Sequence, residues 1–270
     1  MSVAPTDTTY RLVRGDSPLL ISMPHTGSRI PEELHDSYQP RALGSEDSDW
    51  HLERLYGFAA ALGAGLIVPQ FSRYLIDLNR PPDDAPMYPG ASNTELCPTR
   101  FFTGEPLYRE GAAPDAAERE RRRAMYWQPY HDALQAETTR LREAHGHAVL
   151  FDAHSIRSVL PWLFEGTLPD LNLGTADGRS CDPALARRLG AIMADQRQYS
   201  QVVDGRFKGG FITRHYGRPG EGVHTVQLEM CQSCYMREAP PFDYDEARAE
   251  QVQALLHQMV RAMRDWRPGV

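Results

Sequence analysis

Several short runs of the chain are almost continuously apolar, and more polar segments separate them. The strand-like runs cover residues 18–23, 65–71, 73–78, 148–154, 201–207 and 224–230. Strands of this kind are typical of a sheet that is covered on both faces, whereas strands that face water on one side alternate apolar and polar residues. The pattern therefore predicts a sheet between layers of helices.

Four other segments predict helices, at residues 49–62, 115–145, about 183–196 and about 244–266. A polar residue within 47–49 is available as N-cap of the first helix, and Pro129 predicts that the second is kinked or divided. Asp182 and Pro183 begin the third helix as cap and first helical residue. Strands that alternate with helices predict an α/β fold, with one domain over residues 1–270 and a mixed, mostly parallel sheet flanked by helices.

Composition and charge narrow the classes of partner. The chain has 270 residues, of which 41% are hydrophobic, and a net charge of −7. Its one dense basic run, RERRR at 119–123, predicts a solvated helix face rather than a nucleic-acid site. No apolar run reaches 18 residues, so we expect no membrane span. The first residues lack the pattern of a signal peptide, and four cysteines in such a chain do not suggest a disulfide scaffold, so we expect a cytoplasmic protein, with a homo-oligomer left open.

Polar residues with metal-binding or catalytic side chains stand at the ends of the apolar runs. His25 follows the first run, Asp49 stands at a helix start, His154 ends the run HAVLFDAHS, and Glu229 interrupts the last run. Two histidines and one carboxylate, with a fourth position open for water, form a ligand set that suits catalytic zinc. A glutamate that is left unligated could take a proton from that water.

Each of these residues also has an ordinary structural interpretation. A histidine at a strand end is often only hydrogen-bonded, and Asp49 could cap the helix that follows it. Glu229 favours function more strongly, because burying an unpaired carboxylate in an apolar strand is costly.

Two further clusters suit an anionic ligand. In SRYLIDLNRPP, at 72–82, an arginine beside an asparagine can hold a carboxylate, although an ion pair between Arg80 and Asp77 is the alternative. In KGGFITRHYG, at 208–217, two glycines allow close backbone approach to a ligand, although an ordinary mobile loop explains them equally well. The aperiodic segment 81–114 predicts a loop that borders the site.

Other motifs in the chain give weak signals. CQSC, at 231–234, has no second C-x-x-C to complete a four-cysteine zinc site, and it follows the last strand, which fits a thioredoxin-like role poorly. The glycine-containing stretches lack the spacing of a phosphate loop, and no serine stands in a G-x-S-x-G elbow. We therefore expect neither nucleotide binding nor a serine nucleophile.

Six short motifs in order along the chain resemble those of the N-formylglutamate amidohydrolases. They are SMPHTG, DSDWHLERLY, SRYLIDLNR, DAHS, KGGFITRHYG and VQLEM, and the resemblance extends from about residue 18 to 260. It implies an α/β hydrolase of the phosphorylase/hydrolase-like type, distantly similar to zinc carboxypeptidases and aspartoacylases.

The resemblance also implies roles for particular residues. His25, an acidic residue and His154 would bind one divalent metal, which we expect to be zinc, and Glu229 would act as general base. The carboxypeptidase pattern H-x-x-E would need an acid where this chain has Ser28. We therefore expect the acidic ligand from further along the chain, and we choose Asp49 over Asp47 and Glu46.

The implied reaction is hydrolysis of N-formyl-L-glutamate to formate and L-glutamate, a step of histidine degradation. Since this substrate carries two carboxylates, we expect arginines among its ligands. The expected substrate-binding residues are Arg73, Asn79, Arg80, Gly209 and Gly210, and Arg214 is expected to stabilise the oxyanion. A related deacylase or carboxypeptidase-like hydrolase of another N-acyl amino acid is the first alternative, and a non-catalytic module that binds an acidic metabolite is the second.

Overall fold

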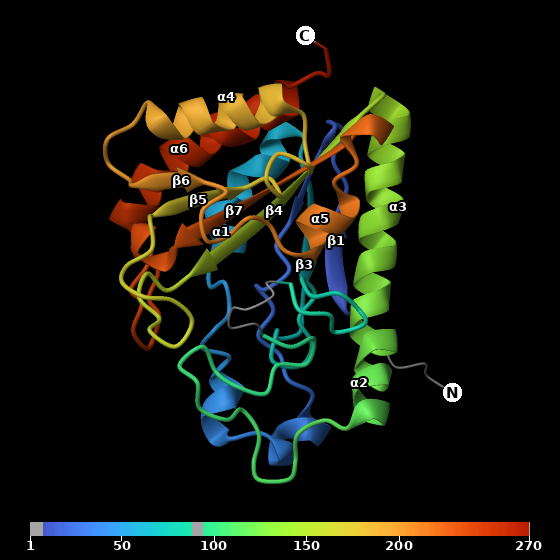
Figure 1. Cartoon of the computed structure of the whole chain (residues 1–270), viewed down its shortest axis with the longest axis vertical. Coiled ribbons are helices and arrows are strands. Elements are labelled where there is room, and N and C mark those ends of the chain that lie inside the picture. Colours follow the sequence, from blue (N-terminus) through green and yellow to red (C-terminus); the bar gives the residue numbers. More distant parts are fainter. Residues whose placement is uncertain (1–7, 88–93, 270) are drawn as a thin grey trace.

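A mixed seven-stranded sheet forms the centre of the computed structural model, which describes residues 8–87 and 94–269 (Figure 1). The strands are β1 (Tyr10–Val13), β2 (Leu19–Ser22), β3 (Gly65–Pro69), β4 (Ala148–Ile156), β5 (Leu171–Gly174), β6 (Gln201–Val203) and β7 (Val223–Cys231), in the order β1-β3-β2-β4-β7-β5-β6. Four neighbouring pairs are parallel, and β1 and β5 each run antiparallel to a neighbour. The predicted mixed, mostly parallel α/β sheet is confirmed.

The described residues form six α-helices, most of which flank this sheet. They are α1 (Leu52–Leu55), α2 (Ala116–Arg122), α3 (Gln128–His145), α4 (Pro183–Ala194), α5 (Phe211–Tyr216) and α6 (Glu246–Asp265). The predicted start of α4 is confirmed, because the Asp182 side chain accepts a hydrogen bond from the backbone N–H of Ala184. Pro129 lies in the first turn of α3, and a π-helical turn at Arg123–Trp127 joins α2 to α3, so the predicted break is a joint within one helical stretch.

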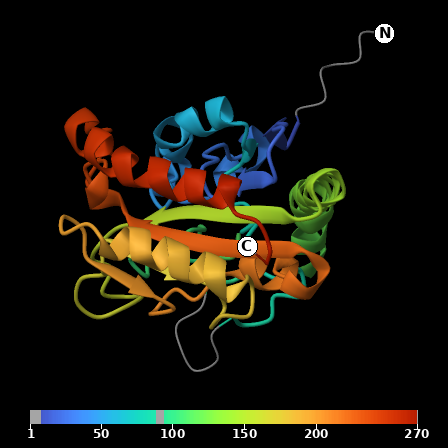
Figure 2. The same cartoon turned by 90° about the horizontal axis from the view of Figure 1, so that it is seen from above.

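Both faces of the central strands are buried, each against a different set of helices. On β4, Val149 and Phe151 pack in the cluster that contains residues of α1, α4 and α6, whereas Leu150 packs with α3 and α5. Figure 2 shows α6 and α1 on one side of β4 and β7, with α5 on the other. Because successive side chains of a strand point to opposite faces, burial on both faces produces the continuous apolar runs of the sequence.

The predicted strand at 73–78 is wrong. These residues are buried, but they form turns, and Arg73 and Asp77 form an ion pair with 2.7 Å between Nη2 and Oδ2. In a strand, residues four apart are separated by roughly 13 Å, so an extended segment could not make this contact. The ion pair and its neighbours therefore favour a compact turn.

Three smaller expectations also need correction. The strand predicted at 201–207 ends at Val203, because Asp204 has a positive φ of 49° that turns the chain. The predicted helix at 49–62 is divided between α1 and a 3-10 helix at Gly57–Leu62. No residue of 47–49 caps α1, whose N-cap is His51, and the His51 side chain makes no hydrogen bond to the helix.

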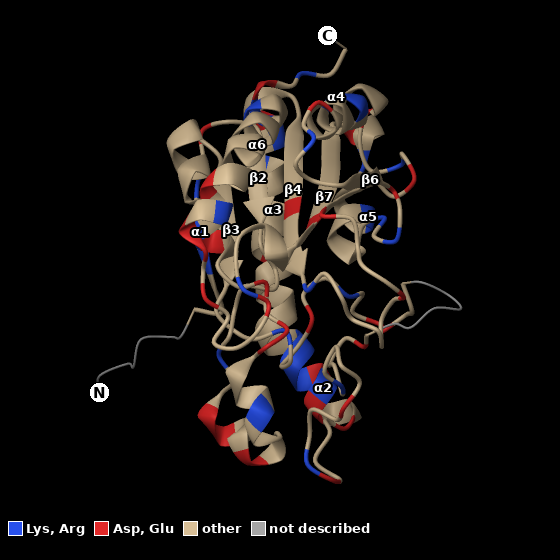
Figure 3. Cartoon of the chain, turned by 90° about the vertical axis from the view of Figure 1, so that its left-hand side faces the viewer, with Lys and Arg blue, Asp and Glu red and all other residues tan. Residues whose placement is uncertain are grey.

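The basic run at 119–123 is only partly a solvated face. Arg122 is buried, and its Nη1 donates hydrogen bonds to the hydroxyls of Tyr38 and Tyr108 and to the carbonyl of Leu75. Figure 3 shows acidic and basic positions side by side on α2, where Glu118 pairs with Arg122. This buried arginine ties α2 to distant loops.

The chain's irregular segments gather beyond one end of the sheet. The 3-10 helices at Glu32–Ser37 and Pro40–Gly44 and the described loop at 94–115 lie beyond the end at which the β4 arrow points (Figure 1). Part of the loop predicted at 81–114, residues 88–93, lies outside the described residues. In the part of the chain that the structure describes, no helix has the length and apolar character to cross a membrane.

Candidate active site

Two neighbouring parallel strands bring His25 and His154 together. Ser22, the last residue of β2, is paired with Asp152 of β4, so His25 and His154 both lie just beyond this pair. Their Nδ1 atoms are 3.2 Å apart, and both side chains are buried. The strand-end positions in the sequence thus lead to one shared site.

Asp49 completes this group from a segment that precedes α1. Its backbone N–H donates to the carbonyl of His25 at 2.9 Å, which fixes the carboxylate beside the imidazoles. Asp49 Oδ2 lies 3.3 Å from His154 Nδ1 and 3.8 Å from His25 Nδ1.

Asp47 lies elsewhere, because its carboxylate accepts hydrogen bonds from Arg157, Tyr74 and the Phe102 backbone. Glu46 pairs with Arg41.

One group of side chains among the described residues could hold a metal ion. It consists of His25, Asp49 and His154. Zinc holds nitrogen and oxygen ligands at about 2.0–2.2 Å, which in a tetrahedron separates ligand atoms by roughly 3.3–3.6 Å. The three observed separations, 3.2, 3.3 and 3.8 Å, are close to that range. Within the described residues, Asp49 Oδ2 is buried without a hydrogen-bond partner, which is costly unless a cation compensates it. The residues therefore fit a divalent cation.

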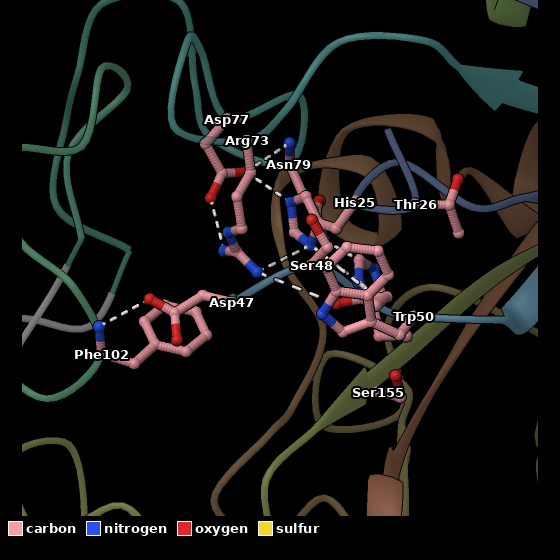
Figure 4. A network of polar contacts seen from close by, with 12 residues as sticks. His25, Thr26, Asp47, Ser48, Trp50, Arg73, Asp77, Asn79, Phe102 and Ser155 are labelled. Atoms are coloured by element: carbon pink, nitrogen blue, oxygen red, sulfur yellow. Dashed lines mark hydrogen bonds and ion pairs between the residues drawn. The ribbon is translucent and has the colours of Figure 1, made fainter. Parts of the chain in front are cut away.

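Two more carboxylates hold the far nitrogens of the histidines. His25 Nε2 lies 2.7 Å from Asp77 Oδ1 (Figure 4). His154 Nε2 lies 3.0 Å from Asp152 Oδ2. Because an ionised carboxylate only accepts hydrogen bonds, each Nε2 carries a proton and each Nδ1 faces the other imidazole. Histidines that bind metals are commonly oriented in this way by a carboxylate.

The pKa values of the two imidazoles differ because their neighbours differ. Burial and the charge of Arg73 lower the pKa of His25, against the opposing effect of Asp77. Burial also acts to lower the pKa of His154, but Asp152, with Asp49 and Glu229, raises it well above its ordinary value. Burial acts to raise the pKa of Asp77, yet His25 and Arg73 hold it well below the usual range. The site therefore keeps its orienting carboxylate ionised.

Glu229 lies on β7 directly opposite His154 on β4, so both side chains point to the same face of the sheet. It lines a cavity of about 130 Å³ together with His25, His154 and Arg73. Burial raises the pKa of Glu229 to about 8, and Asp49 adds to this effect, whereas His154 and Arg73 oppose it. A carboxylate with its pKa near neutrality in a cavity has the character of a general base.

Asn79 binds protein groups on both sides of its amide. Its Nδ2 donates to Asp152 Oδ2 at 3.1 Å, and its Oδ1 accepts from the backbone N–H of Ile212 at 2.8 Å, in the first turn of α5. A Cβ added to Gly210 would lie 2.4 Å from Asn79 Nδ2, so only glycine permits this close packing. The backbone N–H of Gly210 donates to Gln227 Oε1. The structure thus places Gly210 and Asn79 in one packed unit at the cavity wall.

The predicted arginines occupy three different environments. Arg73 is buried at the site, where its Nη1 donates to His25 Nδ1 at 3.1 Å and its guanidinium lies 4.6 Å from the ring of Phe102. Arg80 lines the cavity and is held by Thr94, whereas the ion pair that was its alternative is made by Arg73. Arg214 is exposed and is not among the lining residues, and its Nε donates to the carbonyl of Gly209, where φ is +108°.

Several lining residues had not been singled out from the sequence. They are Thr94, Phe102, Ser155, Ile156, Leu163, Arg206, Phe207 and Gln227. Phe102 lies in the segment that was expected to border the site. Arg206, by contrast, belongs to the run 201–207 that was expected to be a strand, so it was not considered part of the site, although it lies four residues before Gly210.

Comparisons of the sequence with known proteins find relatives of one family. A family model described as N-formylglutamate amidohydrolase matches residues 17–236. Two curated proteins, each named N-formylglutamate deformylase, are similar over almost the whole chain. The protein from Pseudomonas putida is 51% identical over 94% of each chain, and the one from Pseudomonas aeruginosa is 50% identical over 96% of this chain and 97% of that protein.

Two solved structures share the fold. The crystal structure of an N-formylglutamate amidohydrolase from Ralstonia eutropha JMP134 matches with a TM-score of 0.82 at 24% identity, over 97% of this chain and 99% of that chain. A gene product from Agrobacterium tumefaciens matches with a TM-score of 0.70 at 18% identity, over 94% of both chains. At these identities the structural likeness supports the fold alone.

Proposed function

The chain belongs to the N-formylglutamate amidohydrolase family, and on that premise we propose that it hydrolyses N-formyl-L-glutamate to formate and L-glutamate. The resemblance drawn from the motifs is thereby confirmed. One observation carries the proposed reaction: a single cavity is lined by two candidate metal ligands, a carboxylate of raised pKa and several arginines. This combination suits attack of water on an amide of an anionic substrate.

We propose His25, Asp49 and His154 as ligands of one divalent metal, and zinc as its identity. Two nitrogens and one oxygen match the ligand preference of catalytic zinc, and the partnerless oxygen of Asp49 supports a cation at this point. When bound, such an ion lowers the pKa of a water and polarises the formyl oxygen. Asp77 and Asp152 keep the two imidazoles oriented for it.

Glu229 acts as the general base in this proposal. It takes a proton from the attacking water while the water oxygen bonds to the formyl carbon. It then gives that proton to the substrate nitrogen as the C–N bond breaks, which releases formate and the free amino group of glutamate. Its position opposite His154 on the neighbouring strand supports this role.

The arginines divide the remaining tasks. We assign oxyanion stabilisation to Arg73, because its guanidinium lies at the ligand set, whereas Arg214 lies outside the cavity lining. Arg80 binds the α-carboxylate, next to Asn79, which positions it through the backbone. Gly210 shapes the wall that carries Asn79, whereas Gly209 packs against Thr213 and does not line the cavity. Phe102, which stacks on Arg73, limits access of water to this end of the cavity.

Other expectations stay predictions. They are a place for the reaction in histidine degradation, a cytoplasmic location, a single catalytic domain over residues 1–270, and a homo-oligomer. The resemblance and the sequence support the first three, and nothing in the described residues bears on the fourth.

The test compares the zinc-loaded wild type with Glu229→Gln and with the matched surface control Glu250→Gln on α6. Formate release is measured with N-formyl-L-glutamate and with a panel of N-formyl-, N-acetyl- and N-succinyl-amino acids, and zinc per chain is measured by elemental analysis. We expect Glu229→Gln to keep one zinc per chain and to lose roughly 10²–10⁴-fold in turnover, as for removal of a general base. Glu250→Gln should match the wild type.

Three outcomes would overturn these assignments. Zinc-loaded wild type that releases no formate from N-formyl-L-glutamate refutes the proposed reaction, and faster turnover of another acyl amino acid moves it to the related deacylases. Near-normal turnover in Glu229→Gln leaves that residue a structural role.

A further inference from the structure

We propose that Arg206 is the residue that selects substrates with a negatively charged side chain, by binding the distal carboxylate at the mouth of the cavity. This inference rests on the proposed function and deepens it. Arg206 lines the same cavity as Glu229 and the two histidines, although it is exposed and comes from the loop after β6.

The loop that carries Arg206 is fixed in position. The backbone N–H of Asp204 donates to the carbonyl of Leu173, and Asp204 Oδ1 accepts from the backbone N–H of Thr175 at 2.7 Å. Both partners belong to the end of β5 or the residue after it. The side chain of Arg206 is held as well, because its Nη2 donates to the carbonyl of Leu163. Because both its loop and its guanidinium are held, the Arg206 side chain loses less conformational entropy when it binds an anion.

Arg206 donates fewer hydrogen bonds to protein groups than the other cavity arginines, so more of its donors remain for an anion. Arg73 is paired with Asp77, and Arg80 donates to Thr94 and to the carbonyl of Asn79. None of the ion pairs found among the described residues includes Arg206, whose contacts are one carbonyl and the faces of two phenylalanine rings. A guanidinium has five N–H donors and favours a carboxylate that it can hold in a fork.

Apolar side chains lie in the same lining as these polar groups. Ile156, Leu163 and Phe207 line the cavity with Arg206, whose guanidinium carbon lies 5.8 Å from the Phe207 ring. A glutamyl side chain has two methylene groups followed by a carboxylate. The apolar wall suits the methylene groups, and the cation of Arg206 suits the carboxylate. A neutral side chain would leave the cation without a partner.

The experiment measures kcat/KM for N-formyl-L-glutamate and for its neutral isostere N-formyl-L-glutamine. Arg206→Met keeps the apolar stem over the phenylalanine rings and removes the charge. We expect it to lose about 10- to 100-fold with the glutamate substrate and to change little with the glutamine substrate, as for loss of one charge-assisted hydrogen-bonding partner. Arg206→Lys should restore part of the preference, because it restores the charge without the fork.

Lys208→Met is the matched control. This nearby lysine pairs with Asp177 and does not line the cavity, so its loss should leave the ratio of the two substrates unchanged. Equal losses on both substrates in Arg206→Met, or the same change of ratio in Lys208→Met, would overturn the assignment while the proposed reaction stands. Wild type that hydrolyses neither substrate would instead refute the proposed reaction.

Discussion

Buried histidines of this protein differ in the groups that face their rings. A carboxylate faces His154, and Asp152 raises the pKa of that imidazole well above its ordinary value against the effect of burial. His131 on α3 lies instead between the carbonyl of Leu78 and the hydroxyl of Tyr216, and burial lowers its pKa to about 3. The carboxylates around His154 thus favour a positive charge at that position, whereas His131 stays neutral and supports the fold.

The neutral state of His131 predicts an acid-sensitive stability. The unfolded chain binds a proton on this imidazole below about pH 6.5, whereas the folded chain does so only near pH 3. Between these values unfolding takes up a proton, so the free energy of unfolding falls as the pH falls, by about 1.4 kcal/mol per pH unit for this residue. His131→Gln should remove this part of the slope between pH 6 and pH 4.5, measured by urea unfolding.

A control keeps the other titrating groups constant. His257→Gln replaces a partly exposed imidazole that stacks on Phe58. Burial lowers the pKa of this imidazole as well, but less than that of His131, so the variant should lose a smaller part of the slope. If His131→Gln and the wild type lose stability in parallel on acidification, His131 is not the group that takes up this proton.

At the residue scale, a functional side chain can be predicted from the sequence when its position along an apolar run is itself unusual. His25, His154 and Glu229 stand at or near the ends of apolar runs, where a polar residue needs a reason. The orienting role of Asp77 gives no such signal, because its contact with His25 depends on a turn that the apolar run at 73–78 conceals.

At the element scale, the short helix α5 carries one wall of the site. Its first turn is held by Asn79 Oδ1, and Gly210 immediately before it packs against the same amide. Because Asn79 also donates to Asp152, a displacement of this helix start would reach the carboxylate that orients His154. The glycine is therefore required by close packing, and not by a positive φ, since its φ is −82°.

Gly210→Ala should therefore reduce activity more than it reduces stability. The added Cβ would lie 2.4–2.6 Å from three atoms of the Asn79 side chain, so that side chain or the helix start must move. We expect roughly 10- to 100-fold lower kcat/KM for N-formyl-L-glutamate, as for a displacement of about 1 Å at an active site, with about 1–3 kcal/mol lower stability from overpacking. Steady-state kinetics and urea unfolding measure both.

Gly190→Ala provides the matched glycine substitution. Gly190 lies within α4, and an added Cβ would meet Val203 at an ordinary 3.7 Å. This variant should be about 0.5–1 kcal/mol more stable with unchanged kinetics. Full activity in Gly210→Ala would show that Asn79 can move without cost to the site.

Elements were predictable where their length gave a clear pattern. β4, β7, α4 and α6 follow long apolar runs or helical stripes and were found at nearly their observed places. β1, β5 and α5 have four to six residues each and lack a long apolar run, whereas the equally short β2 and β3 lie within continuous apolar runs and were predicted. Tertiary contacts, rather than local sequence preference, decide these short elements.

At the scale of the whole molecule, local charge differs from overall charge. The chain has a net charge of −7, yet Arg73, Arg80 and Arg206 line the cavity. At physiological ionic strength, interactions between exposed charges are largely screened beyond about 8 Å. The affinity for an anionic substrate therefore depends mainly on these nearby arginines, and the acidic surface has little effect on it.

The proposed metal would join segments that are far apart in the sequence: the end of β2, the chain before α1 and the strand β4. Since a metal that binds only the folded state stabilises it by mass action, zinc at about 1,000 times its Kd should add roughly 4 kcal/mol, or about 10 °C in Tm for a chain of this size. Calorimetry of chelator-treated protein, with and without added zinc, measures this shift. His154→Ala should bind no zinc at this site and show no shift, whereas Glu229→Gln, which keeps all three proposed ligands, should show the full shift. If His154→Ala shows the same zinc-dependent shift in Tm, the metal binds elsewhere. If the wild type shows no shift, these three side chains do not hold a metal.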